Sequence, residues 1–269
     1  MASGLDGQGD AVTWSRESKL NGFLVLLSVM AAWELVSRTE MLNPLFFPPM
    51  SKILRSFFSL VFSGEILAQI LSSMRRAAAG YLLAALVCIP LGIIMGLFNS
   101  VYRALEVVIE TARPLPPPVV VPVAMLFFGL GDGMKVFVIF FSCLWPILLN
   151  TMDGVRNIDR VLIHTARTFG LSQGRAILKV ILPAASPQIM TGLRISLAIT
   201  LILVVISEMV GSSDGIGYFI LDSQRRLKVD QMYAGMLSLA LLGYLLNQLF
   251  LLFSNTFLSW HRGMLRSDK

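Results

Sequence analysis

Long apolar runs separated by short polar segments dominate the sequence. Uncharged stretches of about 20 residues suit membrane-crossing helices rather than tilted strands of about ten residues. The pattern predicts six spans, the third of them interrupted by prolines, and an even number puts both chain ends on one side of the membrane. The expected spans lie within residues 20–37, 77–98, 101–130, 136–152, 189–210 and 232–260.

Charged residues are too few for a soluble protein of this length. They make up 14% of the chain, against 55% hydrophobic residues, whereas a soluble domain carries about 25%. The composition therefore predicts an all-α, polytopic integral membrane protein. The net charge of +6 fits basic loops beside anionic lipid. It does not indicate nucleic-acid binding, because basic and aromatic residues do not interleave.

The polar and apolar segments divide the chain into four regions. Ile53, Phe57, Leu60 and Val61 follow one another at helical spacing, which predicts an amphipathic helix at the membrane surface. The regions are a cytoplasmic tail (1–19), a first span with an external amphipathic segment (20–76), a core domain (77–260) and a second cytoplasmic tail (261–269).

Residues that could carry out catalysis or bind a metal do not cluster. Cys88 and Cys143 lie inside apolar runs and are expected to be small buried hydrophobes, while His164 and His261 lie far apart in polar flanks. A metalloprotease needs paired histidines on one helix, and a nucleotide hydrolase needs GxxxxGK[ST], which is missing. We therefore expect no metal, no cofactor and no enzymatic activity, so any ATPase would reside in a separate subunit.

A basic segment, residues 159–183, separates two of the apolar runs. Asp159 is a good N-cap, and Leu162, Ala166 and Phe169 fall on one helical face. Gly170 ends this helix, which we place at residues 159–172. Ser172 can cap a second helix, running to an expected break at Pro183.

Basic residues in the loops orient the chain. The region 153–188 holds five Lys or Arg, whereas those of the 211–230 loop are offset by aspartates, so region 153–188 and both termini are expected to be cytoplasmic. Segment 38–76 does not fit this topology, because it is basic and yet is placed outside the membrane. Its basic residues are Arg38, Lys52, Arg55, Arg75 and Arg76.

A proline cluster interrupts the third apolar run. Irregular backbone at membrane depth is tolerated only where it is buried in protein or lines a cavity. The cluster is thus a candidate wall of a translocation path, and a tight loop at the membrane surface is the alternative. The loop after the fifth span is a second candidate. The candidate path residues are Pro114, Pro116, Pro117, Pro118, Glu208, Gly211 and Gly215.

An ion-coupled secondary transporter is a second hypothesis. Such carriers bind ions at mid-membrane through acidic groups and broken helices. Glu34, Glu106, Glu110 and Glu208 are the candidate carboxylates, and each could instead be a helix-end or interfacial carboxylate.

The basic segment resembles the cytoplasmic signature of permease subunits of binding-protein-dependent ABC importers. That pattern is Glu-Ala-Ala, three residues, Gly, nine residues, then Ile-x-Leu-Pro. The spacing is kept, although His164, Thr165 and Val180 replace the usual Glu, Ala and Ile. The corresponding residues are His164, Thr165, Ala166, Gly170, Val180, Leu182 and Pro183. FPPMSKILRSF, RPLPPPVVVPVAMLFFGLG and EMVGSSDGIGYFI further resemble the nitrate, aliphatic-sulfonate and taurine branch.

The resemblance implies a division of labour. Two copies of a bacterial inner-membrane permease would line one path, two ATP-binding cassette ATPase subunits would bind the 159–172 helix, and an extracytoplasmic protein would deliver the solute. A small sulfonate, taurine or nitrate-like anion is the implied solute. His164 replaces an acidic residue, so no salt bridge to the ATPase is expected from it, while the helix–glycine–helix geometry is kept.

Overall fold

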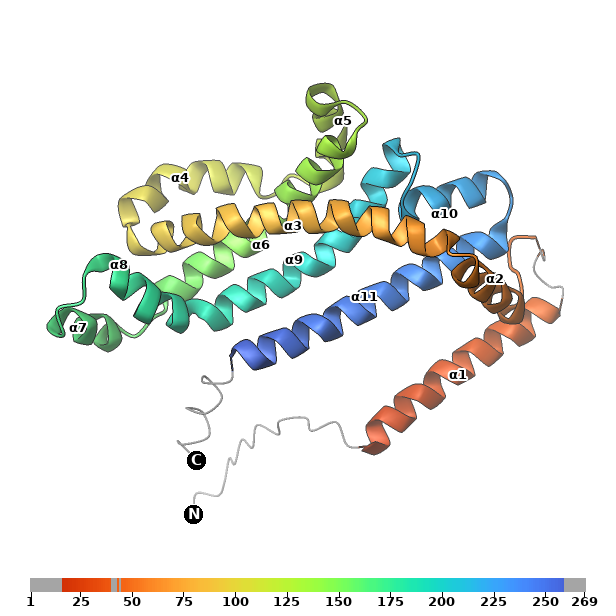
Figure 1. Cartoon of the computed structure of the whole chain (residues 1–269), viewed down its shortest axis with the longest axis horizontal. Coiled ribbons are helices and arrows are strands. Elements are labelled where there is room, and N and C mark those ends of the chain that lie inside the picture. The colour runs from red at the N-terminus through yellow and green to blue at the C-terminus, as the bar shows by residue number, and fades with distance from the viewer. Residues whose placement is uncertain (1–15, 40–42, 44, 259–269) are drawn as a thin grey trace, which may run out of the picture.

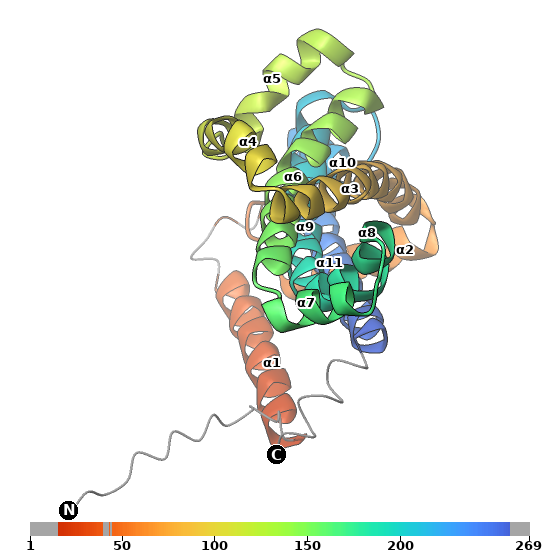
Figure 2. The same cartoon turned by 90° about the vertical axis from the view of Figure 1, so that its left-hand side faces the viewer.

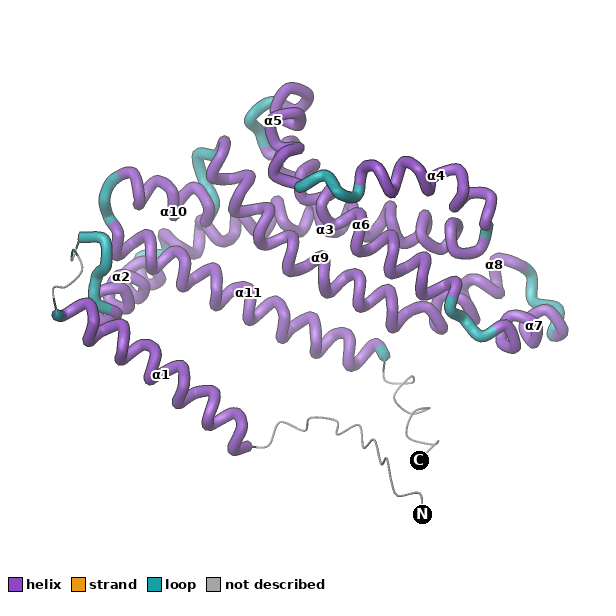
Figure 3. Tube along the Cα trace, turned by 180° about the vertical axis from the view of Figure 1, so that it is seen from behind, coloured by secondary structure: helices purple, strands orange, loops and turns teal. Residues whose placement is uncertain are grey.

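Every regular element among the described residues of this computed structural model is a helix (Figure 3). The structure describes residues 16–39, 43 and 45–258. The all-α prediction is therefore confirmed, whereas residues 1–15 of the first predicted tail and all of the second, 261–269, lie outside the described part. Four long helices give the molecule its length (Figure 1), namely α3 (Glu65–Leu97), α6 (Asp132–Arg156), α9 (Leu182–Gly211) and α11 (Val229–Phe257).

The centre of the molecule is the packing of α6 between α3 and α9. Gly92 of α3 lies so close to α6 that an added Cβ would come within 2.7 Å of the Thr151 side chain, and Gly96 approaches Val155 equally closely. Small residues let membrane helices approach in this way and gain van der Waals contact. The side chains between them, such as Val138 and Cys143, are fully buried.

Among the described side chains of helix α1 (Arg16–Arg38), those near its C-terminal end contact the rest of the molecule. Trp33 stacks on Phe47 at 4.1 Å and donates a hydrogen bond of 3.1 Å to the Pro48 carbonyl. The rest of the helix diverges from the bundle (Figure 2), and side chains such as Leu27 are exposed. An apolar helix with so little protein contact must be covered by lipid or by another chain.

The predicted amphipathic helix exists as α2 (Met50–Phe62). Its buried residues Ile53 and Leu60 face protein, because Leu60 packs in one cluster with Ile66 of α3 and Phe219 of α10 (Ile216–Arg225). The buried part of the apolar side of α2 therefore packs on the neighbouring helices, and the position of α2 at the membrane surface stays a prediction.

The helix that carries the expected second span begins twelve residues before Ala77, since α3 starts at Glu65. The extra three turns bury Ile66, Ser73 and Arg76 against the rest of the molecule. Arg76 does not end the helix, since its charge is paired inside the protein. Part of the topology conflict thus disappears, because one of the basic residues placed outside is no exposed loop charge.

The expected break at Pro183 is also wrong. Helix α8 (Gln173–Ala176) continues through the π-helical segment η1 (Ile177–Ile181) into α9, and residues 173–211 form one continuous helical stretch. The Leu182 N–H bonds to the Ile177 carbonyl, five residues earlier. This shift of the hydrogen-bonding pattern accommodates a proline without N–H, so the helix passes Pro183 without ending.

Four helical stretches among the described residues are long and apolar enough to cross a membrane: Glu65–Leu97, Asp132–Arg156, Gln173–Gly211 and Val229–Phe257. Helices α4 (Asn99–Ala112) and α5 (Pro117–Phe128) form a fifth candidate, bent by 99°. The polytopic class is confirmed, and the count of six spans remains a prediction that depends on α1 and on the bent pair.

Candidate functional site

The basic segment folds into the short helix α7 (Arg160–Thr168), with the predicted cap at Asp159 and the predicted stop at Gly170. The helix is shorter than the expected 159–172, because the chain already leaves it at Thr168. The Asp159 carboxylate accepts a hydrogen bond of 2.8 Å from the Val161 N–H. Gly170 adopts a φ of 66°, a left-handed conformation that costs little only for glycine. The Leu171 N–H then bonds to the Ala166 carbonyl at 3.1 Å, which completes a Schellman-type end.

The face of α7 that packs against the protein differs from the expected one. Ala166 is buried and Ile163 half-buried, whereas Leu162 is 48% and Phe169 79% exposed. Phe169 follows the last helical residue and turns outward with the chain, so it no longer shares the Ala166 face. The helix therefore presents apolar side chains to its surroundings, at one end of the bundle (Figure 1).

Residues matching the signature lie on two sides of this element. Ala166 and Val180 line a groove of about 190 Å³ beneath α7, together with Leu97 and Phe98 at the end of α3. Leu182 and Pro183 are half-buried in the first turn of α9. His164, Thr165 and Gly170 are exposed. The structure thus separates residues that fix α7 to the bundle from residues that are free to contact a partner.

The proline cluster coincides with the bend between α4 and α5. Pro114 lies in the connection, Pro116 is the residue before α5, and Pro117 and Pro118 form its first turn. A cavity of about 1040 Å³ opens between this bend and α6. Its polar and aromatic lining residues are Tyr102, Glu106, Glu110, Arg113, Trp145, Asn150 and Asp153. The bend therefore borders a polar cavity, as a wall of a path would.

A buried ion network lies at the other end of the long helices, where α3, α6 and α9 meet the 211–217 loop. We call it the Arg76 cluster, and its members are Arg76, Asp132, Lys135, Glu208 and Asp214. The Arg76 Nη1 donates a hydrogen bond of 2.8 Å to Glu208, and its Nε donates one of 2.6 Å to Asp132. Its Nη2 donates to the Asp214 carboxylate. One guanidinium thereby joins three separate segments.

Glu208 is fully buried, and its carboxylate already accepts hydrogen bonds from three groups of the protein, one of them Arg76. The Ser73 hydroxyl lies 2.8 Å from both carboxylate oxygens, and the Gly217 N–H donates at 3.0 Å. Gly215 packs directly on the carboxylate, since a Cβ there would overlap it, and its φ of 105° favours glycine. Glu208 therefore holds the loop in place and is poorly suited to carry an ion.

The outer part of the Arg76 cluster faces solvent. Asp132 and Asp214 have side chains that are 56% and 40% exposed. Lys135 is buried and donates a hydrogen bond of 3.0 Å to the Ser212 hydroxyl. The hydrogen bond from Arg76 holds the pKa of Asp214 below its ordinary value of 3.8, so Asp214 stays ionised at neutral pH.

The two sets of predicted path residues do not meet around one cavity. Among the described residues that line the polar cavity, Pro114 represents the first set, and Glu208, Gly211 and Gly215 do not appear. The sequence pattern did not indicate Arg76, Asp132 and Lys135 as a site. The available signal was that Arg76, Asp132 and Glu208 each lie at the end of an apolar run that faces the same side of the membrane.

Comparison with known proteins identifies the family. Residues 88–259 match the family of the binding-protein-dependent transport system inner membrane component. The chain belongs to this family. A protein of Methanocaldococcus jannaschii assigned as an ABC transporter permease is 34% identical over 86% of this chain and 88% of its own length. The taurine transport system permease TauC of Escherichia coli is 29% identical over 82% of each chain.

A third relative is the nitrate import permease NrtB of Leptolyngbya laminosa, which is 36% identical over 67% of this chain and 65% of its own. The protein is thus a multi-pass permease component of the inner membrane. Permeases of this family work with an ABC ATPase and a solute-binding protein. The hypothesis of an ion-coupled carrier finds no support in this family, and in the structure Glu208 is already paired with Arg76.

Proposed function

We propose that this permease subunit conducts a small anion, a sulfonate such as taurine or a nitrate-like ion, in an ATP-driven importer. Taurine and nitrate are the named solutes of two relatives that match most of this chain. A separate extracytoplasmic protein delivers the solute, so the permease needs no high-affinity site of its own. The polar cavity beside the α4–α5 bend is the proposed conduit.

The energy enters through α7, which binds the ATPase subunit, where ATP is hydrolysed. The single observation that carries this proposal is the build of α7, a capped helix fixed by Ala166 and exposing Leu162 and Phe169. Exposed aromatic side chains of this kind supply much of the energy of protein interfaces. A short, stiff helix can then transmit a rigid-body movement to α9 through η1.

Two copies of the chain form the complete path in this proposal. The polar cavity is lined by α4, the connection that follows it and α6, and a second copy would complete its wall. In this dimer, α7 and both termini of each copy are cytoplasmic. The membrane core of each copy begins near the Arg76 cluster. Counting α1 and the α4–α5 pair gives six spans.

The backbone at Gly170 allows a sharp test. Gly170→Val introduces a β-branched residue at a φ of 66°, which costs about 1–2 kcal/mol or more and reorients the end of α7. Gly174→Val is the matched control, because Gly174 is exposed, has an ordinary φ and leaves open space where a Cβ would lie. We expect Gly170→Val to lose ATP-driven uptake and ATPase association, while Gly174→Val keeps both.

The result that would contradict this role is wild-type uptake and ATPase binding in Gly170→Val. Protein level in the membrane and the elution profile in detergent separate this outcome from misfolding. Uptake that persists after ATP depletion and collapses with an ionophore would contradict the ATP-driven function as a whole.

A further inference from the structure

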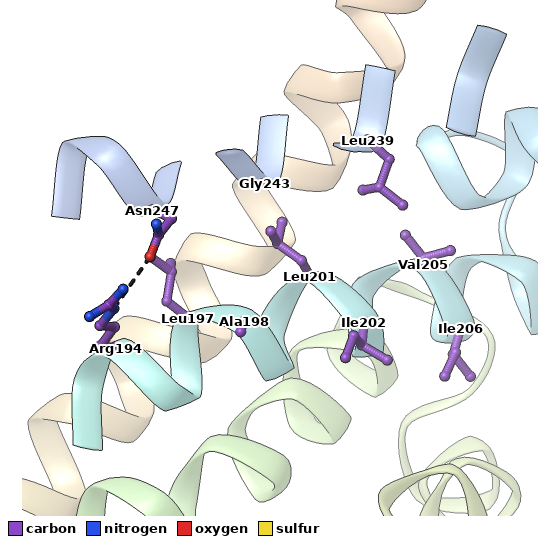
Figure 4. A pocket seen from close by; sticks show the side chains of 10 residues that line it. All are labelled: Arg194, Leu197, Ala198, Leu201, Ile202, Val205, Ile206, Leu239, Gly243 and Asn247. Carbon is purple, nitrogen blue, oxygen red and sulfur yellow. Dashed lines mark hydrogen bonds between the residues drawn. The ribbon is translucent and has the colours of Figure 1, made fainter. Parts of the chain in front are cut away.

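A groove between α9 and α11 combines an apolar floor with one cationic end (Figure 4). Its volume is about 540 Å³. Leu197, Leu201 and Val205 of α9 line it, with Leu239 and Gly243 of α11 opposite. Arg194 and Asn247 lie together at one end.

Arg194 has an incomplete set of partners in this groove. Its Nε donates a long hydrogen bond of 3.3 Å to the Asn247 side-chain oxygen, and the residue is exposed. No carboxylate in the described part of the chain forms an ion pair with it. A charged side chain on a membrane helix is costly unless a counter-charge or water compensates it, so this end of the groove favours an anion.

The depth of Arg194 in the bilayer favours the anionic headgroup of a lipid as its partner. Along α9, Arg194 lies 14 residues before Glu208, or about 21 Å at 1.5 Å per residue. The Arg76 cluster reaches solvent at that side, and the hydrocarbon core is about 30 Å thick. Arg194 therefore lies in the half of the membrane nearer α7, within reach of the headgroup region by snorkelling of its long side chain.

The groove is long enough to hold most of an acyl chain. From Arg194 to Ile206 it follows 12 residues of α9, about 18 Å, and from the depth of Arg194 its far end passes the middle of the hydrocarbon core. We propose that this groove binds one anionic phospholipid of the leaflet on the α7 side. The phosphate pairs with Arg194 and one acyl chain lies along Leu197 and Leu201.

Binding of phosphatidylglycerol by the purified full-length chain tests this site. Native mass spectrometry counts one-to-one adducts during titration with phosphatidylglycerol or phosphatidylcholine. We expect phosphatidylglycerol to bind about fivefold more tightly, the effect of about 1 kcal/mol for one basic residue near a membrane surface. Arg194→Gln abolishes this preference, and Arg194→Lys keeps most of it.

Two further variants separate the headgroup from the tail. Ala198→Leu fills the groove beside Leu197 and lowers the binding of both lipids. Arg103→Gln, which removes an exposed arginine of α4 outside the groove, changes neither. Unaltered adducts in both Arg194→Gln and Ala198→Leu would overturn the proposal, as would equal binding of the two lipids by the wild-type chain.

The other possible occupant is α1 of a second copy, whose apolar side chains are exposed. A disulfide between Ala198→Cys in one copy and Leu27→Cys in another, formed in native membranes at high yield, would assign the groove to protein and overturn the lipid site. Absence of this cross-link together with selective loss of phosphatidylglycerol in Arg194→Gln supports it. Neither result depends on transport activity, so the proposed function can fail independently.

Discussion

The Glu208 carboxylate, fully buried in α9, lies 2.8 Å from the Arg76 guanidinium of α3. Neither group has access to bulk water, since the Arg76 side chain is only 5% exposed. A buried ion pair contributes little net stability when intact, yet removing one partner leaves an uncompensated charge in the interior. This asymmetry makes the pair a sensitive point of the fold.

Arg76→Gln should therefore strongly destabilise the protein. We expect a loss of about 3–5 kcal/mol, visible as a lower unfolding temperature of the purified chain in detergent. Arg75→Gln is the control, because Arg75 is adjacent and less buried, and its replacement should stay within about 0.5 kcal/mol. Replacing both Arg76 and Glu208 by leucine should recover part of the loss. An unchanged unfolding temperature in Arg76→Gln would contradict the pairing.

Gly215→Ala should be more harmful than alanine at another glycine with a positive φ. The new Cβ would overlap the Glu208 carboxylate, and the φ of 105° disfavours any side chain. Overpacking and backbone strain together predict a loss of about 3 kcal/mol. Gly129→Ala is the matched control, with a φ of 68° and open space around the added atom. The yield of folded protein in size-exclusion chromatography measures the effect of each variant. Similar losses of yield in Gly215→Ala and Gly129→Ala would refute the close packing.

Because of Asp214, the stability of the loop between α9 and α10 should decrease at acidic pH. Its pKa lies below 3.8 in the folded protein because Arg76 bonds the carboxylate. A depressed pKa means that the stabilisation is complete above about pH 5 and is lost as the pH falls toward the folded value. Unfolding temperatures between pH 3 and 7 should drop more steeply for wild type than for Asp214→Asn. Parallel curves for the two proteins would show that the ion pair is ineffective.

Local signals predicted α7 well. The Asp159 cap and the Gly170 stop are decided within a few residues of chain, so the sequence specifies them directly. The amphipathic helix α2 was predictable for the same reason. The error at Pro183 is also local, since a π-helical turn cannot be recognised from helical spacing and lets the helix continue past a residue that normally ends it.

The Arg76 cluster could not be predicted in the same way. Its members lie 56 to 138 residues from Arg76 along the chain, and their meeting depends on how α3, α6 and α9 cross. Before folding, Arg76 is indistinguishable from Arg75 beside it. Arg76 is buried and Arg75 is not because of the rotation of α3 about its axis, and the helices packed against α3 fix this rotation.

Phe169→Ala should separate partner binding from folding. Phe169 is 79% exposed, so the unfolding temperature should not change. An aromatic residue at the centre of an interface typically contributes more than about 1–2 kcal/mol, so ATPase association should weaken about tenfold. Leu178→Ala, in η1 and 67% exposed, is the control off the α7 surface. Equal effects of the two substitutions on the measured dissociation constant would argue against α7 as the contact.

Opposite faces of α4 should differ in their reactivity toward a water-soluble thiol reagent. Glu110 lines the polar cavity, whereas Val107 is 72% exposed on the apolar face outside it. Only the thiolate reacts, and it forms in water but not in lipid, so Glu110→Cys should be labelled in intact membranes and Val107→Cys should not. Cys88 and Cys143 are fully buried, which keeps the background of the wild-type chain low. If Val107→Cys were labelled as fast as Glu110→Cys, α4 would have no face toward lipid. If Glu110→Cys were not labelled by the reagent, the cavity would lie outside the path.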